Sequence, residues 1–184
     1  MQNEKELRDQ ISKAQQDFYQ ENSKNRFFKN NQKFQCAKQV SQQVDLTKMI
    51  NLTYFNIPDT NIVYFNYILF KSYASDEVKD ALYQRFCNVI QEVIAKYGIF
   101  EMHCNLQSFT VSAAQRYYSF ITSSIDDNDD FSNKMIKLHV YHTPSVIEQI
   151  VLLLKKSVGQ FLNRATFHKK DESDALIQKL FENL

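Results

Sequence analysis

Three of the four histidines in the chain, His103, His139 and His168, lie in stretches with the composition of β-strands. If these strands are neighbours in one sheet, the three imidazoles could converge, and three imidazoles are a known zinc ligand set. The sequence lacks the closely spaced ligand pair that identifies a zinc site. We therefore favour histidines that are hydrogen-bonded within the protein or solvated, and we expect no metal and no cofactor.

An acidic run at residues 126–130 suggests a calcium loop at first sight. The run does not fit the calcium-binding pattern, because Phe131 stands where a glycine is needed and Lys137 where the closing glutamate should be. We expect a solvated loop.

The cysteines Cys36, Cys87 and Cys104 are odd in number and far apart, which argues against a disulfide framework. Cys104 follows His103, but neighbouring side chains of a strand point to opposite faces, so His103 cannot activate this thiol. Two glycines are too few for a phosphate-binding loop. We expect a protein that is not an enzyme and that resides in a reducing intracellular compartment, in the cytoplasm or at the periphery of an organelle membrane complex.

The composition is that of a folded protein with balanced charge. The chain has 184 residues, 43% of them hydrophobic, and a net charge of +1. This balance gives no electrostatic reason to expect a nucleic-acid partner. No stretch reaches the roughly 18 apolar residues that a membrane-spanning helix needs.

Elements of two kinds alternate along most of the chain. The composition predicts strands at residues 52–57, 62–70, 99–106, 135–142 and 163–169, and helices at residues 75–97, 110–123, 144–158 and 171–183. The first two strands flank a turn that contains Pro58 and Asp59, which predicts an antiparallel hairpin. The later alternation predicts an α/β fold with a mostly parallel β-sheet and right-handed βαβ crossovers.

We expect two parts, residues 1–45 and residues 46–184. The first part is polar, but Leu7, Ile11, Ala14 and Phe18 follow the spacing of one helical stripe. This spacing predicts an N-terminal helical extension. A segment this polar cannot order itself by burial, so we expect it to pack on its own domain or on other protein subunits.

Residues 46–184 resemble the CRAL-TRIO lipid-binding domain family. The resemblance rests on the order of the elements and on three stretches: the hairpin that ends in residues 62–65, the strand and loop at residues 97–109, and the run 137–144, which ends in Thr143 and Pro144. Residues 146–162 are similar to the family's gate helix and the segment after it. The sequence departs from the family at Asn105 and Ser108, which stand where Asp and Gly are frequent.

The resemblance implies a pocket for one phospholipid or other hydrophobic ligand beneath the helix at residues 144–158. The candidate lining residues are Val146, Ile150, Leu153 and Leu154 on the helix, with His103, His139 and Tyr141 on the sheet. The last three belong to a strand face rich in ionisable groups. Such a face is a poor surface for an acyl chain, because unpaired polar groups are costly to bury.

Two functions from different classes follow. The polar extension and the ionisable strand face favour a non-catalytic structural subunit of a larger assembly, with residues 1–45 in contact with other subunits. The family resemblance favours a lipid-binding or lipid-transfer protein. The sequence alone leans slightly towards the structural subunit.

Overall fold

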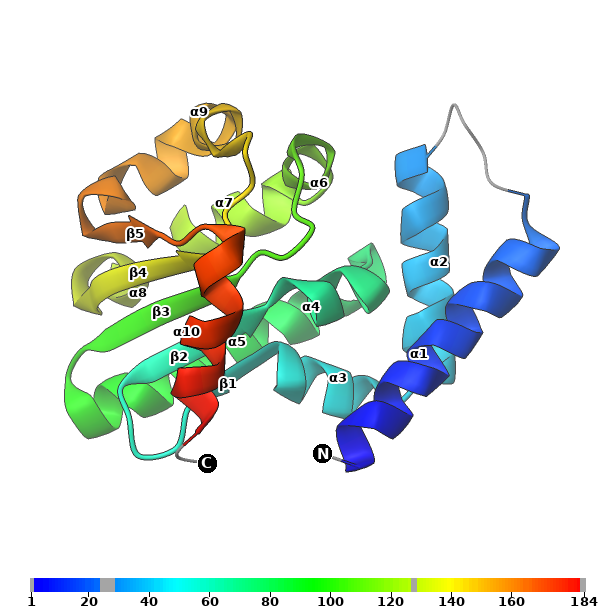
Figure 1. The fold of residues 1–184 in the computed structure, drawn as a ribbon, viewed down its shortest axis with the longest axis horizontal. Helices are drawn as coiled ribbons and strands as arrows, with labels where there is room; N and C mark the ends of the chain where they lie inside the picture. The colour runs from blue at the N-terminus through cyan, green and yellow to red at the C-terminus, as the bar shows by residue number, and fades with distance from the viewer. Residues whose placement is uncertain (1, 24–28, 127–128, 183–184) are drawn as a thin grey trace.

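The computed structural model describes residues 2–23, 29–126 and 129–182, which form an α/β fold (Figure 1). Within these residues, five strands form one sheet in the order β1-β2-β3-β4-β5. The first pair is antiparallel and the other three pairs are parallel. The predicted mostly parallel sheet with an opening hairpin is therefore confirmed.

The strands are β1 (Tyr54–Asn56), β2 (Ile62–Asn66), β3 (Phe100–Asn105), β4 (Met135–Tyr141) and β5 (Ala165–Phe167). The α-helices are α1 (Gln2–Glu21), α2 (Lys29–Gln43), α3 (Leu46–Thr53), α4 (Tyr67–Tyr73), α5 (Lys79–Tyr97), α6 (Val111–Arg116), α7 (Tyr118–Asp126), α8 (Asp129–Lys134), α9 (Ile147–Val158) and α10 (Lys170–Phe181). Short 3-10 helices precede α5 (Asp76–Val78) and follow α9 (Gly159–Arg164).

The two faces of the sheet differ in chemistry. On the apolar face, Phe65, Cys104, Val140 and Phe167 form one row across four strands. On the polar face, the row displaced by one residue runs through Tyr64, His103, His139 and Thr166. This separation follows from the alternation of side chains along each strand.

The helices that connect the parallel strands all cover the apolar face. The strands β2 to β5 follow one another in space in the same order as in sequence. Right-handed crossovers that always step in one direction place every connecting helix on one side of the sheet. The helix α10 lies on the other side, where Phe181 contacts Tyr64 with ring centroids 5.2 Å apart (Figure 1).

The opening hairpin is shorter than the sequence predicts. The predicted strand at residues 62–70 ends at Asn66, and residues 67–70 are helical in α4. The Asn66 side chain caps α4 by accepting a hydrogen bond from the Leu69 N–H at 3.3 Å. The sequence prediction was wrong here because an aromatic run suits a buried strand and a buried helix equally well.

The junction between β4 and α9 also differs from the prediction. We expected Pro144 to be the first residue of the helix, but α9 begins at Ile147. In the segment between β4 and α9, His142 adopts a positive φ of 50°. Its backbone N–H donates a hydrogen bond to Ser173 Oγ at 2.7 Å. The helix α9 ends at Val158, the predicted end, and the chain continues from Gly159 as a 3-10 helix.

Other helix ends agree with the sequence in part. Gly98 follows α5 with a φ of 76°, as a glycine after a helix commonly does, and Thr110 Oγ1 caps α6. The predicted helix at residues 110–123 divides at Tyr117 into α6 and α7. Of the predicted acidic loop, Asp126 belongs to α7 and residues 129–130 to α8, while residues 127–128 lie outside the described residues.

The N-terminal helices pack on the rest of the chain. The predicted stripe of Leu7, Ile11, Ala14 and Phe18 is buried. Leu7, Ile11 and Ala14 belong to the same hydrophobic core as Val40 of α2. This core also contains buried residues of the sheet and of the helices that connect its strands. At the other end of α2, Asn30 Oδ1 accepts hydrogen bonds from Arg116. The helices α1 and α2 therefore pack on the rest of the chain, which is one of the two expected arrangements.

Because this core is shared, replacing Ile11 by Ala should destabilise the whole fold. We expect the free energy of unfolding to fall by about 2–5 kcal/mol, as for other buried aliphatic truncations. Urea unfolding followed by tyrosine near-UV circular dichroism measures this change. The exposed neighbour Gln10→Ala is the control and should stay within about 0.5 kcal/mol of wild type. An unchanged midpoint for Ile11→Ala would show that the helices form an independent arm.

Candidate functional site

An apolar cavity lies between the apolar face of the sheet and the helices that cover it. Its volume is about 200 Å³. The sheet contributes Phe65, Met102, Cys104, Leu138 and Val140, and α9 contributes Ile150, Val151, Leu154 and other aliphatic residues. Aromatic residues of α4, α5 and α7 line the remaining sides, together with Phe109 of the loop before α6 and Tyr117 between α6 and α7: Tyr67, Phe70, Phe86 and Phe120.

The polar side chains around this cavity form hydrogen bonds within the protein or are uncharged. The Ser124 hydroxyl donates a hydrogen bond to the Phe120 carbonyl at 2.7 Å. Burial raises the pKa of the Cys104 thiol to about 12, so this thiol is protonated and a poor nucleophile at neutral pH. The cavity therefore presents hydrocarbon, aromatic and thiol surface, and it suits an apolar molecule.

One end of the cavity reaches the protein surface at the β5 edge of the sheet. Leu162 and Phe167 both line the cavity, yet they are 38% and 39% exposed. Because both side chains line the cavity and also reach solvent, the cavity meets the protein surface beside them. We interpret this edge as the opening of the cavity.

The structure divides the predicted pocket residues into two groups. Ile150 and Leu154 line the cavity, whereas Val146 and Leu153 pack against the core beside it. The prediction that His103, His139 and Tyr141 lie beneath the helix was wrong, because their strands turn the opposite face towards α9. The reason is the one-directional strand order, which places α5 and α9 on the same, apolar side.

Sequence reasoning missed the aromatic side of the cavity. Phe70 was placed in a strand, and Phe109 in a loop of no assigned role. The signal in the sequence is the density of aromatic residues between positions 54 and 120, but their convergence depends on the break between β2 and α4. Tyr117 and Ile121, from the predicted helix at residues 110–123, also line the cavity.

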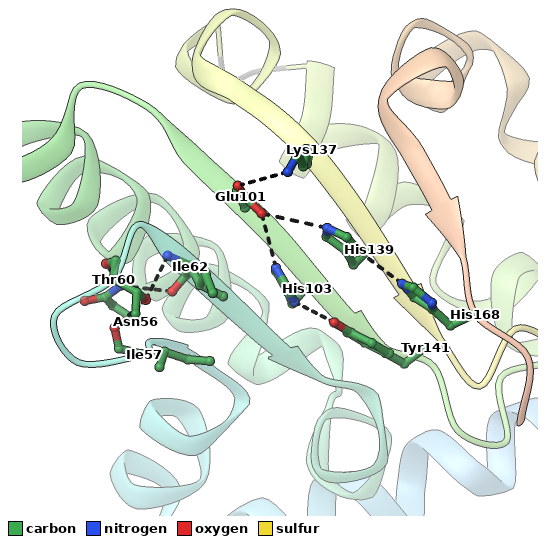
Figure 2. A network of polar contacts seen from close by, with 10 residues as sticks. All are labelled: Asn56, Ile57, Thr60, Ile62, Glu101, His103, Lys137, His139, Tyr141 and His168. Carbon is green, nitrogen blue, oxygen red and sulfur yellow. Dashed lines mark hydrogen bonds and ion pairs between the residues drawn. The ribbon is translucent and has the colours of Figure 1, made fainter. Parts of the chain in front are cut away.

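On the polar face, the expected convergence of histidines does occur (Figure 2). His103 and His139 are direct partners on β3 and β4, with ring centroids 4.5 Å apart. The Glu101 carboxylate oxygen Oε2 lies 3.7 Å from Nε2 of each ring. His139 Nδ1 lies 3.0 Å from Nε2 of His168, and His103 Nδ1 lies 2.8 Å from the Tyr141 hydroxyl.

The cluster is partly sheltered from water. His103 is 4% exposed, and its Nε2 atom has no hydrogen-bond partner. Burial, then the nearby rings of His139 and His168, lowers the pKa of His103 to about 3. Burial also lowers the pKa of His139, and it raises that of the Tyr141 hydroxyl. At neutral pH, both imidazoles are therefore uncharged.

The fourth histidine, His142, stands apart from this cluster. It is buried at the end of β4, and its Nε2 lies 3.2 Å from a carboxylate oxygen of Asp174 on α10. In the acidic segment, Asp126 accepts a hydrogen bond from the Ser157 hydroxyl of α9 at 2.9 Å. This contact ties α7 to α9 beside the cavity.

Comparison with known proteins gives no match to a family model, to a curated protein or to a solved structure. Among the helices that the structure describes, none has the length and apolar character needed to cross a bilayer.

The shifted pKa of His103 predicts a pH-dependent stability. Protonation is easier in the unfolded chain, where the pKa is near 6.5, than in the folded protein, where it is about 3. The contribution of the uncharged His103 ring to the stability of the folded state is therefore complete above pH 6.5. It is lost as the pH falls towards 3. Its slope between these limits approaches about 1.4 kcal/mol per pH unit, the value for one proton.

Urea unfolding of wild type and His103→Gln between pH 7.5 and 4.5, with a chelator present, measures this slope. Other polar side chains lie close to the ring, so the informative quantity is the difference between the two slopes: Glu101, Lys137, His139, His168 and Tyr141. We expect a shallower slope for the variant. Parallel slopes would contradict the assignment to His103.

Proposed function

We propose that the protein binds one small apolar ligand, or a single short hydrocarbon chain of a lipid, between its sheet and α9. The observation that carries this proposal is the cavity of about 200 Å³ with its hydrocarbon and aromatic walls. Burying apolar surface there is favourable by about 0.8 kcal/mol per CH₂ group. The ionisable strand face points away from the cavity, so it does not oppose this proposal.

The size of the cavity limits the ligand. Pockets for drug-sized molecules usually have volumes of about 300–1,000 Å³. A cavity of about 200 Å³ is smaller. It suits one short chain rather than both chains of a phospholipid, unless α9 moves outward.

The exposed edge supplies a route for entry. Leu162 and Phe167 connect the cavity to the surface beside the end of α9. A chain that enters here meets apolar side chains along its whole path, and a polar head group would stay in water at the edge. This arrangement supports binding of an amphipathic molecule by its hydrocarbon end.

The resemblance to CRAL-TRIO domains supports the same proposal. In that family a hydrophobic ligand lies beneath the gate helix, and the stretch that resembles the gate helix and the segment after it, residues 146–162, includes α9. We therefore propose a CRAL-TRIO-like fold whose N-terminal helical part is reduced to α1 and α2.

A non-catalytic structural subunit of a larger assembly is the second proposal. One observation favours it: α1 buries its apolar stripe in the chain, and from residue 5 onward its outer surface is polar, including Arg8, Asp9 and Gln16. Such a surface suits contacts with other protein subunits. Native mass spectrometry distinguishes the proposals, since a ligand carrier shows one bound apolar molecule and a purely structural subunit does not.

Filling the cavity should weaken ligand binding. We expect decanoic acid to bind wild type with one-to-one stoichiometry in isothermal titration calorimetry, with the negative heat-capacity change of apolar burial. Val151 lines the cavity, so Val151→Trp should weaken this binding at least tenfold. The matched control is Leu152→Trp, because Leu152 is the next residue of α9 and is 72% exposed.

The control variant should bind as wild type does. Equal affinities for Val151→Trp and wild type would place the ligand elsewhere. An absence of binding to wild type would leave the structural proposal as the better one.

A further inference from the structure

We propose that Glu101, His103 and His139 form a binding site for a divalent transition-metal ion, with Zn²⁺ as the best-fitting ion. The three residues lie together on the polar face (Figure 2), and the cavity lies on the other side of the sheet. The inference is therefore independent of the proposed ligand binding.

The donor atoms are already close to a metal-binding arrangement. One ligand atom from each residue lies within 4.8 Å of the other two, and Glu101 Oε2 is 3.7 Å from both Nε2 atoms. Zinc bonds of about 2.0–2.2 Å in a tetrahedral site require donor separations of about 3.3 Å. Small rotations of the side chains therefore bring all three donors to a shared ion.

The strands hold the donors in this arrangement. Glu101 and His103 are two residues apart on β3 and so point to the same face. The direct pairing of His103 with His139 brings the second imidazole from β4. Donors on paired central strands of a sheet are more rigid than donors on loops.

A buried nitrogen without a hydrogen-bond partner supports the binding of an ion here. His103 Nε2 has no hydrogen-bond partner, although the residue is 4% exposed. Leaving a buried polar atom unpaired is costly, and such atoms in folded proteins are rare. A metal ion on Nε2 would satisfy it. Glu101 and His139 are each about one-fifth exposed, which gives the ion access from solvent.

The surrounding residues orient the imidazoles as metal sites require. With Nε2 of each ring bound to the ion, His103 Nδ1–H would donate to the Tyr141 hydroxyl and His139 Nδ1–H to His168 Nε2. His168 Nδ1 in turn lies 3.6 Å from the Glu172 carboxylate. Metal-bound histidines almost always donate their second N–H in this way. Tyr141 and His168 are thus positioning residues.

The donor set selects the class of ion. Two neutral imidazoles and one carboxylate match catalytic-type zinc sites with three protein ligands, in which water takes the fourth position. Mg²⁺ and Ca²⁺ prefer oxygen donors and fit poorly. Lys137 Nζ pairs with the other carboxylate oxygen of Glu101 at 3.7 Å and leaves Oε2 for the ion.

Titration of the tag-free, chelator-treated full chain with ZnSO₄ at pH 7.5 tests the proposal. We expect one ion per chain with micromolar or tighter affinity in isothermal titration calorimetry, and a rise in Tm on adding Zn²⁺. Glu101→Gln and His139→Gln should each weaken binding at least tenfold. His168→Ala should weaken it less, because it only orients a ligand.

Glu148→Gln is the matched control, since it makes the same change at an exposed carboxylate of α9 on the other side of the sheet. It should bind Zn²⁺ as wild type does. Circular dichroism confirms that each variant is folded. Millimolar or weaker binding by wild type would overturn the proposal, and so would equal affinities for folded Glu101→Gln and wild type.

Discussion

The fold depends on one constraint, the one-directional order of its parallel strands. Because β2 to β5 are adjacent in the order of the chain, each right-handed crossover places its helix on the same side of the sheet. That side receives α5, α7 and α9 and becomes the core. The other side is covered in part by α10 and keeps the polar residues. The separation of a hydrocarbon cavity from a histidine cluster follows directly.

Alternation along β3 and β4 then fixes the chemistry of each compartment. His103 and Cys104 are neighbours in sequence, but one belongs to the proposed metal site and the other lines the cavity. A shift of one residue in the register of β3 would exchange them, and it would bury His103 among aromatic rings while exposing Met102 and Cys104. The register is therefore strongly specified by the apolar residues, and the donors on the polar face are positioned as a consequence.

Local patterns in the sequence predicted the kinds of element well. Alternating residues gave β3 and β4, the hairpin turn gave the antiparallel pair, and the stripe from Leu7 to Phe18 gave α1. The sequence alone could not show which face of the strands turns towards the connecting helices. That depends on strand order, a long-range property, and the wrong choice placed His103, His139 and Tyr141 beneath α9. The break at Asn66 was missed for a different reason, because a capping side chain ends a run whose composition alone favours a longer strand.

The two proposed sites make different demands on the same sheet. A ligand between the strands and α9 needs side chains that can move aside. The helix α9 carries an exposed Leu152, and it continues into a 3-10 segment rather than ending in a firmly capped turn. A metal ion needs donors fixed to within a fraction of an ångström, which paired strands provide. Placing the ion on the polar side of β3 and β4 would hold these strands together through a bond network that does not involve α9. The helix could then move to admit a ligand while the register of the strands beneath it stays fixed.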